Sequence, residues 1–376
     1  MADAAPDAGL DRRYMAAALR LGRANLGRTF PNPAVGALIV RHEPSGPRIV
    51  GGGWTAAGGR PHAEVEALAE AGEEARGATA YVTLEPCAHE GHTPPCANAL
   101  VAAGVSRVVT AIADPDPRVS GRGHAILEAA GIAVTTGVLA ADARLAHGGH
   151  ISRVTRGRPW VILKLAVSAD GMIGRREGER MIITGRPAFE RVQAIRSECD
   201  AVMVGIGTVL VDDPRLTVRL PGAEARDPIR IILDTNAVIG LDTNLVKSAR
   251  EVPLWLMVSE TAEAERVTLL EASGAVVVRV REGSGGLDIE AVFSALAERG
   301  LTRVLVEGGS RVASSLISAG LADEVILFRA PVVVGPDGVR ALGGHALSAI
   351  ERSPRYQLVA EQPLGEERMR RYLRTP

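Results

Sequence analysis

Residues 61–64 are Pro-His-Ala-Glu, and residues 83–96 are Thr-Leu-Glu-Pro-Cys-Ala-His-Glu-Gly-His-Thr-Pro-Pro-Cys. The candidate metal ligands in these two stretches are the imidazole of His62 and the thiols of Cys87 and Cys96. One imidazole and two thiolates leave the fourth tetrahedral position of zinc open for water, as in catalytic sites, whereas structural sites are normally closed by four protein ligands. The pattern therefore predicts a catalytic zinc site. A structural site with a fourth ligand elsewhere in the chain is the alternative.

The residues around these ligands predict how the site is built. Pro61 and Pro86 precede His62 and Cys87, so each of these two ligands is expected to open a helix, where the N-terminal dipole favours a thiolate. Glu64 is expected to face the open zinc position without binding the metal. A carboxylate there can take a proton from zinc-bound water and pass it to a leaving group. The simpler alternative is that Glu64 only places a negative charge in the first turn of a helix.

Length and composition narrow the class of protein. The chain has 376 residues, 46% of them hydrophobic and 23% charged, which is typical of a globular protein with two domains. Its net charge of −1 and its aromatic content of 3% argue against a nucleic-acid partner, because such proteins usually carry a basic excess and stacking aromatics. We therefore expect small-molecule substrates. With no apolar run of about 18 residues and no secretory signal pattern, we expect no membrane partner and a cytoplasmic location.

The first half, residues 1–150, alternates short apolar runs with helix-like stretches, which predicts a mainly parallel sheet covered on both faces. The expected strands are 34–40, 48–54, 78–84, 107–112 and 132–138, and the expected helices are 14–25, 62–71, 97–103 and 124–130. Residues 147–159 are rich in Gly and Arg and are expected to form the linker between the domains.

A second α/β pattern occupies residues 158–376. Its expected strands are 160–167, 200–204, 229–233, 253–258, 275–280, 302–306 and 324–330, and its expected helices are 186–196, 262–273, 289–299 and 311–319. The segments 355–361 and 368–373 are expected to pair as an antiparallel ribbon at the sheet edge.

Two glycine motifs of the second half bear on cofactor binding. Gly205 and Gly207 form a Gly-x-Gly pair that lacks the third glycine of a dinucleotide fingerprint, so this motif is weak. Residues 304–310, Val-Leu-Val-Glu-Gly-Gly-Ser, predict a strand that passes through glycines into a helix. Such a turn offers free backbone N–H groups to a phosphate, although an ordinary strand–helix turn is the alternative.

With residues 83–96 complete, the first half resembles the zinc-dependent deaminase of riboflavin biosynthesis, and Pro31-Asn32-Pro33-Ala34-Val35-Gly36 fits the same family. The resemblance rests on the eight residues between Cys87 and Cys96, where most zinc nucleobase deaminases have two. It implies a cytidine-deaminase-like three-layer α/β/α domain. It also places Asn32 near the pyrimidine, although Asn32 can simply cap a turn. His89 and His92 are either solvated loop residues or substrate contacts.

The second half resembles the reductase half of the same bifunctional family, whose fold is similar to that of dihydrofolate reductase. The resemblance implies that NADPH is bound by a set of small and polar residues: Ala166, Ile182, Thr208, Asp212, Thr235, Gly309, Ser310, Arg311, Val312, Ala313, Ser314 and Ser315. It implies that a ribose phosphate substrate is bound by Lys164, Arg180, Arg196, Leu216, Arg219 and Glu307, together with Asn32 in the first half. At Arg180 and Ile182 the chain departs from the family, whose members often have Ser and an aromatic residue there. Lys164 as a solvated strand-end lysine is the alternative for that position.

The resemblance thus implies a bifunctional enzyme of riboflavin synthesis. A zinc-bound hydroxide would remove the 2-amino group of 2,5-diamino-6-ribosylamino-4(3H)-pyrimidinone 5′-phosphate, with Glu64 carrying the proton, and NADPH would then reduce the ribosyl chain to ribityl. One rival is a deaminase that edits a flipped nucleic-acid base, which the charge and the scarce aromatics oppose. The other is a monofunctional deaminase whose second half only mediates oligomerisation. A homo-oligomer is expected in either case.

Overall fold

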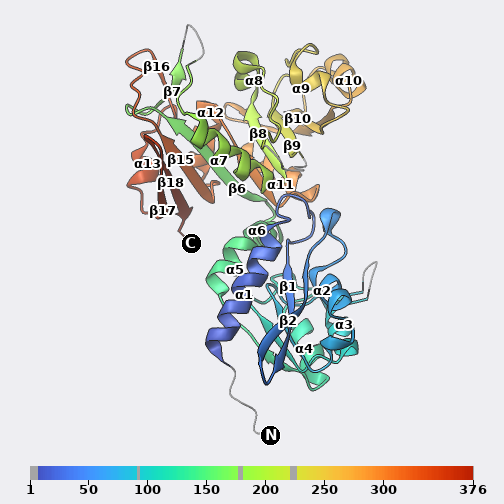
Figure 1. Ribbon diagram of the computed structural model, residues 1–376. Helices are drawn as coiled ribbons and strands as arrows, with labels where there is room; N and C mark the ends of the chain where they lie inside the picture. Colours follow the sequence, from blue (N-terminus) through green and yellow to red (C-terminus); the bar gives the residue numbers. More distant parts are fainter. Residues whose placement is uncertain (1–6, 91–93, 177–180, 221–226, 376) are drawn as a thin grey trace. The chain divides into compact units, whose positions relative to one another are not determined.

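The computed structural model describes residues 7–90, 94–176, 181–220 and 227–375 (Figure 1). The chain divides between Gly157 and Arg158 into two compact units. Each unit has its own central sheet and its own apolar core. Along the described residues, no helix is both long enough and apolar enough to cross a membrane.

The first unit consists of a mixed sheet between two layers of helices. Its elements in chain order are α1 (Ala8–Arg23), β1 (Gly36–Glu43), β2 (Gly46–Trp54), η1 (Ala57–Gly59), α2 (Ala63–Ala71), η2 (Gly72–Ala75), β3 (Thr79–Val82), α3 (Cys96–Ala103), β4 (Arg107–Thr110), α4 (Arg122–Ala129), β5 (Ala133–Thr135), α5 (Ala140–Ala146) and α6 (Gly148–Arg156). Every strand and helix expected between residues 14 and 138 is present, with shifted ends.

The strand order in this unit is β2-β1-β3-β4-β5. β1 is antiparallel to both β2 and β3, whereas the β3–β4 and β4–β5 pairs are parallel. The expectation of a mainly parallel sheet is therefore wrong for this unit. The reason is the connection between β1 and β2, which is only residues 44–45, and so short a turn can join only antiparallel strands.

Glycines let helices approach both faces of this sheet closely. A Cβ on Gly36 of β1 would lie 1.9 Å from the Ala18 carbonyl oxygen of α1, and a Cβ on Gly53 of β2 would lie 2.2 Å from the Ala63 carbonyl oxygen of α2. Gly53 is paired with Ala37, the neighbour of Gly36, and successive residues of a strand point to opposite faces. α1 and α2 therefore cover opposite faces, which confirms the expected covering.

The boundary between the units falls within residues 147–159, the expected linker, but most of this segment is the helix α6 of the first unit. Gly148 and Gly149 are buried in it despite their low helix propensity. Two histidines anchor the segment. His147 Nε2 is 3.1 Å from Thr83 Oγ1, and His150 Nε2 is 2.9 Å from Asp114 Oδ1. Burial lowers the pKa of His147 to about 4, so this side chain is neutral at ordinary pH. Tertiary contacts thus override the local preference.

The second unit is built on one large sheet. Its elements are β6 (Trp160–Val167), β7 (Met172–Arg175), α7 (Arg186–Ser197), β8 (Ala201–Gly205), α8 (Ile206–Asp212), β9 (Ile229–Leu233), α9 (Asn244–Lys247), β10 (Leu254–Ser259), α10 (Ala264–Ala272), β11 (Val276–Val280), β12 (Glu282–Gly283), β13 (Gly286–Leu287), α11 (Ile289–Glu298), β14 (Arg303–Val306), α12 (Ser310–Ala319), β15 (Glu324–Arg329), β16 (Gly338–Arg340), α13 (Ser348–Glu351), β17 (Tyr356–Leu364) and β18 (Glu367–Arg374).

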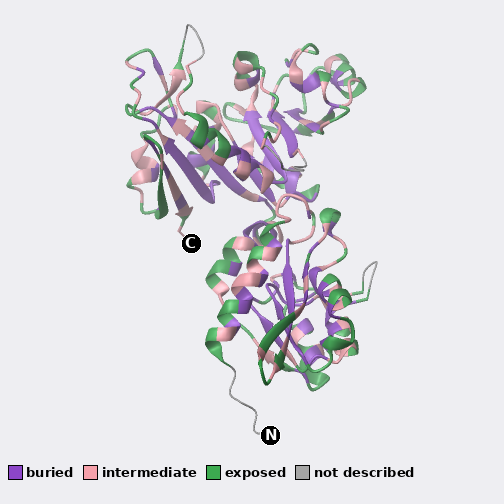
Figure 2. Ribbon diagram, in the orientation of Figure 1, coloured by how far each residue is buried: buried purple, intermediate pink, exposed green. Residues whose placement is uncertain are grey.

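Within the described residues this sheet has nine strands, in the order β11-β10-β9-β8-β14-β6-β15-β18-β17. The strands from β11 to β15 are parallel, and β18 and β17 add an antiparallel pair at the edge. The expected C-terminal ribbon is therefore confirmed. Figure 2 shows the central strands as the most deeply buried part of the unit. α7, α9 and α10 share one apolar core with residues of the sheet, so these helices cover the same face.

Candidate active sites

The three candidate zinc ligands come from two helix starts and one loop. His62 is the N-cap residue of α2, and Cys96 is the first residue of α3, directly after Pro95. Cys87 lies in the loop that follows β3, so the expectation that it opens a helix is wrong. The physical reason is that the eight residues after Cys87 delay the helix until Cys96, where the fixed backbone angle of Pro95 suits a helix start.

These residues bring their donor atoms together. His62 Nδ1 is 3.8 Å from Cys87 Sγ and 3.4 Å from Cys96 Sγ, and the three ligand atoms lie within 4.8 Å of one another. A tetrahedral zinc ion with Zn–S bonds of about 2.3 Å and Zn–N bonds of about 2.0 Å spans such separations. Among the described residues this is the one group of three His, Cys, Asp or Glu side chains arranged to hold a metal. Its donor chemistry fits zinc with one position left over.

The two thiols differ sharply in acidity. Hydrogen bonds from Cys96 and His62, including one from the Cys96 backbone N–H at 3.2 Å, lower the pKa of Cys87 to about 4 against the opposing effect of burial. The Cys87 thiolate, burial and the neighbouring Glu64 raise the pKa of Cys96. The hydrogen bond with Cys87 raises the pKa of His62. One thiolate is thus already favoured by the fold, which is what a metal ligand requires.

Glu64 lies in the first turn of α2, is only 4% exposed, and lies beside the Cys96 thiol. Burial, followed by the negative charge of Cys87, raises the pKa of Glu64 to about 7. A carboxyl group with a pKa near neutrality can both accept and release a proton at the pH of the cell. Glu64 differs in this respect from Glu66 of the same helical turn, whose side chain is exposed.

Glu85, for which the sequence predicts no role, holds the loop after β4 against the loop that carries Cys87. Its side chain is fully buried, and its two carboxylate oxygens accept hydrogen bonds from the backbone N–H groups of Asp114, Gly121, Gly123 and His124, at 3.0 to 3.4 Å. Gly123 allows this contact because a Cβ there would lie 2.0 Å from the Pro86 carbonyl oxygen. A charged residue directly before Pro86-Cys87 is the signal that could have identified this anchor.

Asn32 and His89 flank the same region. Asn32 Nδ2 donates to the Gly59 carbonyl oxygen at 2.8 Å, which ties the segment of Asn32 to the turn just before His62. This bond fits the turn alternative, and it uses the side-chain Nδ2 of Asn32, not the side-chain oxygen Oδ1. His89 is half-buried, and its Nδ1 has no hydrogen-bond partner among the described residues. His92 lies outside the described residues.

In the second unit, Lys164, Arg196 and Glu307 form a buried charge cluster. Arg196 of α7 donates from Nε and Nη2 to the two carboxylate oxygens of Glu307, the second at 2.9 Å. Burial alone would raise the pKa of Glu307, but Arg196, Lys164 and Arg219 together lower it. Burial and Arg196 lower the pKa of Lys164, whose ammonium lies 5.9 Å from the Phe328 ring centroid. Lys164 lies in the middle of β6 and is half-buried, so the solvated strand-end alternative is wrong.

The segment 216–219 passes beside this cluster. Leu216 is buried with a positive φ of 57°, and Arg196 donates from Nη1 to the Thr217 carbonyl oxygen at 2.8 Å. The exposed guanidinium of Arg219 stacks on the Phe189 ring at 5.2 Å, and the Arg219 backbone N–H donates to Gln193 Oε1 at 2.8 Å. Phe189 and Gln193 were missed by the sequence analysis. Their spacing from Arg196 on one helix is the signal that could have identified them.

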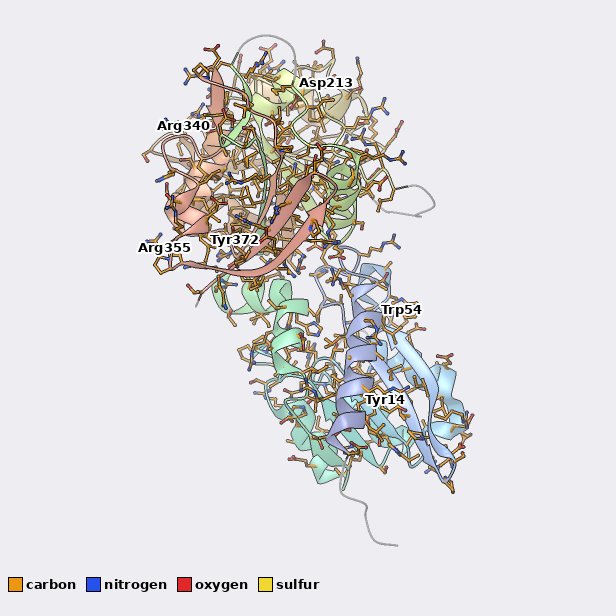
Figure 3. All side chains as sticks on the ribbon, turned by 60° about the vertical axis from the view of Figure 1, so that its left-hand side comes forward. Tyr14, Trp54, Asp213, Arg340, Arg355 and Tyr372 are labelled. Atoms are coloured by element: carbon orange, nitrogen blue, oxygen red, sulfur yellow. The ribbon has the colours of Figure 1, made fainter. Side chains whose placement is uncertain are left out.

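The candidate cofactor residues gather around the expected glycine turn. Gly308 and Gly309, with φ of 151° and 84°, lead from β14 into α12, and a Cβ on Gly309 would lie 3.7 Å from Thr208 Oγ1 of α8. Ser310 Oγ donates to the Arg340 carbonyl oxygen at 2.7 Å. In Figure 3, Asp213, directly after α8, and Arg340 lie at one end of the unit, whereas Arg355 lies toward the other. The turn therefore leaves backbone N–H groups of α12 beside Thr208.

The remaining cofactor candidates are less uniform. Thr235 and Arg311 meet at the β12–β13 turn, because Arg311 donates to the Gly285 carbonyl oxygen at 3.2 Å and a Cβ on Gly286 would lie 3.2 Å from Thr235 Oγ1. Of the other α12 candidates, Val312 and Ser314 are half-buried, Ala313 is buried and Ser315 is exposed. Ala166 and Asp212 are half-buried, at β6 and at the last residue of α8, and Ile182 is 80% exposed. Arg180 lies outside the described residues.

Both units match known family models. Residues 9–112 match the cytidine and deoxycytidylate deaminase zinc-binding region, and residues 159–368 match the RibD C-terminal domain. The riboflavin biosynthesis protein RibD of Aquifex aeolicus is 37% identical over 358 residues, covering 95% of this chain and 97% of the relative. The protein of the same name in Escherichia coli strain K12 is also 37% identical, over 370 residues, with the same two coverages.

Solved structures agree over almost the whole chain. Acinetobacter baumannii RibD is 34% identical, with a TM-score of 0.85, and the match covers 98% of this chain and all of that one. A diaminohydroxyphosphoribosylaminopyrimidine deaminase/5-amino-6-(5-phosphoribosylamino)uracil reductase from Thermotoga maritima is 33% identical, with a TM-score of 0.84 and coverages of 98% and 99%. These comparisons confirm the two α/β domains and the resemblance stated from the sequence.

Proposed function

Because the chain belongs to the RibD family, and is therefore a deaminase and a reductase of riboflavin biosynthesis, we propose that each unit carries one activity. Residues 1–150 form the zinc-dependent pyrimidine deaminase domain, and residues 158–376 form the NADPH-dependent reductase domain. The proposed substrate of the first is 2,5-diamino-6-ribosylamino-4(3H)-pyrimidinone 5′-phosphate. The second reduces the ribosyl chain of the deaminated product to ribityl. The Thermotoga maritima relative is named as a deaminase and a reductase of such pyrimidines, which supports this order of reactions.

In the deaminase domain, His62, Cys87 and Cys96 hold zinc, and Glu64 is the catalytic residue. When bound, the zinc supplies a site at which water becomes acidic enough to attack at neutral pH. Glu64 accepts the proton of that water and delivers it to the departing ammonia. Its burial beside Cys96 supports this role. Burying a carboxylate costs free energy, and a carboxylate that only interacted with the helix dipole could do so while exposed to solvent. Asn32 is proposed to contact the pyrimidine through its carbonyl oxygen.

In the reductase domain, the glycine turn is proposed to bind the cofactor, and the charge cluster and Arg219 are proposed to bind the substrate. The hydride comes from NADPH, so the protein supplies position and electrostatics. The turn through Gly308 and Gly309, with Thr208 and the first residues of α12, is proposed to hold the cofactor phosphates. The guanidinium of Arg219 is proposed to bind the 5′-phosphate of the substrate, while Lys164 and Glu307 lie toward its sugar. The other binding residues implied by the family remain proposals of the same kind.

The observation that carries the proposal is the convergence, within one unit, of three ligand atoms for zinc and a buried carboxylate beside them. The experiment is a two-stage assay on the purified chain. We expect ammonia release from the diamino substrate, and NADPH consumption only once the deaminated pyrimidine is present. Ammonia release without any NADPH consumption, on either substrate, would instead favour the monofunctional deaminase. The buried Arg196–Glu307 pair argues against that alternative, since an unused domain has no reason to keep a costly buried charge cluster.

The state of the protein in the cell is part of the proposal. We propose a cytoplasmic homo-oligomer without a nucleic-acid partner, consistent with the net charge of −1. Self-association is supported by β17, an edge strand with Leu358 and Val359 both more than 40% exposed. Sedimentation of the purified chain would test it, and a monomer at all concentrations would contradict it.

A further inference from the structure

Three residues on one face of α7 lie against the segment that carries Arg219. Phe189, Gln193 and Arg196 occupy positions i, i+4 and i+7 of the helix, which fall on one side of it. Each of them contacts residues 217–219: Phe189 through the Arg219 guanidinium, Gln193 through the Arg219 backbone, and Arg196 through the Thr217 carbonyl oxygen. Helix α7 thus forms a rigid support for a segment that has no regular structure of its own.

The backbone of this segment is held at three consecutive residues. The Thr217 carbonyl oxygen accepts from Arg196 Nη1 at 2.8 Å, the Val218 N–H donates to Asp227 Oδ1 at 2.7 Å, and the Arg219 N–H donates to Gln193 Oε1 at 2.8 Å. With three consecutive anchors, the direction in which the Arg219 side chain leaves the backbone is fixed. Only the side-chain torsions of Arg219 then need further restraint.

Phe189 supplies that restraint. The centroid of its ring lies 5.2 Å from the Arg219 guanidinium carbon, within the range of a cation–π contact, and Phe189 is 41% exposed. Aromatic residues are scarce in this chain. Because Phe189 is partly exposed, burial of its ring contributes little stability at this position. A cation–π contact uses none of the hydrogen-bond donors of the guanidinium.

Gln193 lowers the stability of the fold at its position, because one of its polar groups is buried without a partner among the described residues. It is only 1% exposed, and because its Oε1 accepts from Arg219, its Nε2 is left buried without a hydrogen-bond partner among the described residues. A buried N–H group without a partner destabilises the fold, and a methionine of similar size would avoid that cost. The hydrogen bond that Oε1 accepts from the Arg219 backbone therefore explains why a glutamine occupies this position.

We infer that Phe189 and Gln193 are positioning residues of the reductase, which hold the Arg219 guanidinium ready for the substrate phosphate. The inference rests on the proposed role of Arg219. A flexible arginine must lose side-chain freedom when it binds a phosphate, and an arginine that is already ordered loses less, so its affinity is higher. Phe189 and Gln193 then act on substrate affinity and leave the hydride transfer itself unchanged.

The test measures reductase kinetics in Phe189→Leu and Gln193→Met, with Phe189→Tyr as the conservative variant and Glu190→Gln as the matched control. Glu190 is an exposed neighbour on α7 that is paired with Arg186. We expect the KM for the phosphorylated substrate to rise about two- to fivefold in Phe189→Leu. We expect a rise of about two- to tenfold in Gln193→Met. kcat and the KM for NADPH should stay within about twofold of wild type, and Phe189→Tyr and Glu190→Gln should be unchanged.

Two further measurements separate positioning from a general structural effect. With the dephosphorylated substrate, Phe189→Leu and wild type should have the same KM. In the Arg219→Ala background, Phe189→Leu should add nothing, since contacting residues that act through one another are not additive. Equal losses on both substrates, full additivity with Arg219→Ala, or an unchanged KM in both single variants would overturn the inference. If Arg219→Ala itself left the KM unchanged, the proposed function of Arg219 would fail instead, which is a different result.

Discussion

The two units build their sites in different ways. In the first unit, the ligands and Glu64 fall within residues 62–96 and are placed by the starts of α2 and α3 and the loop after β3. In the second, Lys164, Arg196 and Glu307 come from β6, α7 and the end of β14, 143 residues apart from first to last. The first site is a compact group of candidate metal donors, and the second places two positively charged side chains around one buried carboxylate.

This difference predicts how each site fails. A metal site loses its function when one donor is removed, because three protein ligands leave none to spare. A charge cluster loses stability as well as function, because removing one member leaves the others buried without compensation. The predictions that follow test this contrast, from the largest expected effect to the smallest.

Cys96→Ser should give the largest loss. Removing a ligand should lower zinc content and ammonia release together, by more than the roughly 10–100-fold typical of an outer-shell partner. Elemental analysis and an ammonia assay measure the two effects. Cys199→Ser is the control, since Cys199 is an equally buried thiol of the other unit. A full zinc complement in Cys96→Ser would show that Cys96 is not a ligand.

Glu64→Gln should keep zinc and stop deamination. The amide is nearly isosteric but cannot accept the proton, so ammonia release should fall about 10³–10⁴-fold, toward the upper end of general acid–base effects. NADPH consumption on the deaminated substrate should continue at the normal rate. Glu66→Gln, which removes a charge from the same helical turn, is the control. Similar small losses in both variants would mean that Glu64 serves only the helix dipole.

Glu307→Gln should destabilise the second unit. Without this carboxylate, Arg196 and Lys164 stay buried without a counter-charge, and the free energy of unfolding should fall by roughly 3 kcal/mol. Because the folded state lowers the pKa of Glu307, its stabilisation is present above the ordinary carboxyl pKa and is lost as the pH falls through the folded value. Chemical denaturation at neutral and acidic pH measures the difference from wild type, which should shrink in acid. The control is Glu271→Gln, on the exposed side of α10.

Arg219→Ala should give the smallest of these effects. A charge-assisted hydrogen bond to phosphate contributes about 1.5–3 kcal/mol, or roughly ten- to a hundredfold in the apparent affinity of the reductase for its substrate. Ammonia release should be intact. Arg215→Ala, four residues earlier and also exposed, should leave both activities unchanged. If Arg219→Ala instead abolished ammonia release and spared reduction, the assignment of activities to the two units would be reversed.

Much of the fold follows from patterns along the chain. Alternating apolar runs and helical stretches predicted the main strands of both sheets and the antiparallel pair β17–β18, because burial of one face leaves a period of two or 3.6 in the sequence. The patterns failed where a tertiary contact outweighs a local preference. The buried glycines of α6 are held in a helix by the contacts of His147 and His150, and the direction of β1 depends on a turn of two residues.

The grouping of His62, Cys87 and Cys96 beside Glu64 could be predicted from the sequence alone, because a zinc site requires particular residue types at short spacings. The sequence marks Phe189, Gln193 and Glu85 only by their positions along the chain, and it does not identify the residues that they contact. In these contacts the partners lie 26 to 39 residues apart and belong to common residue types, so no local pattern pairs them. Which long-range pairs meet is settled only when the sheets and helices pack, because the free energy of packing depends on the whole core and on no single segment.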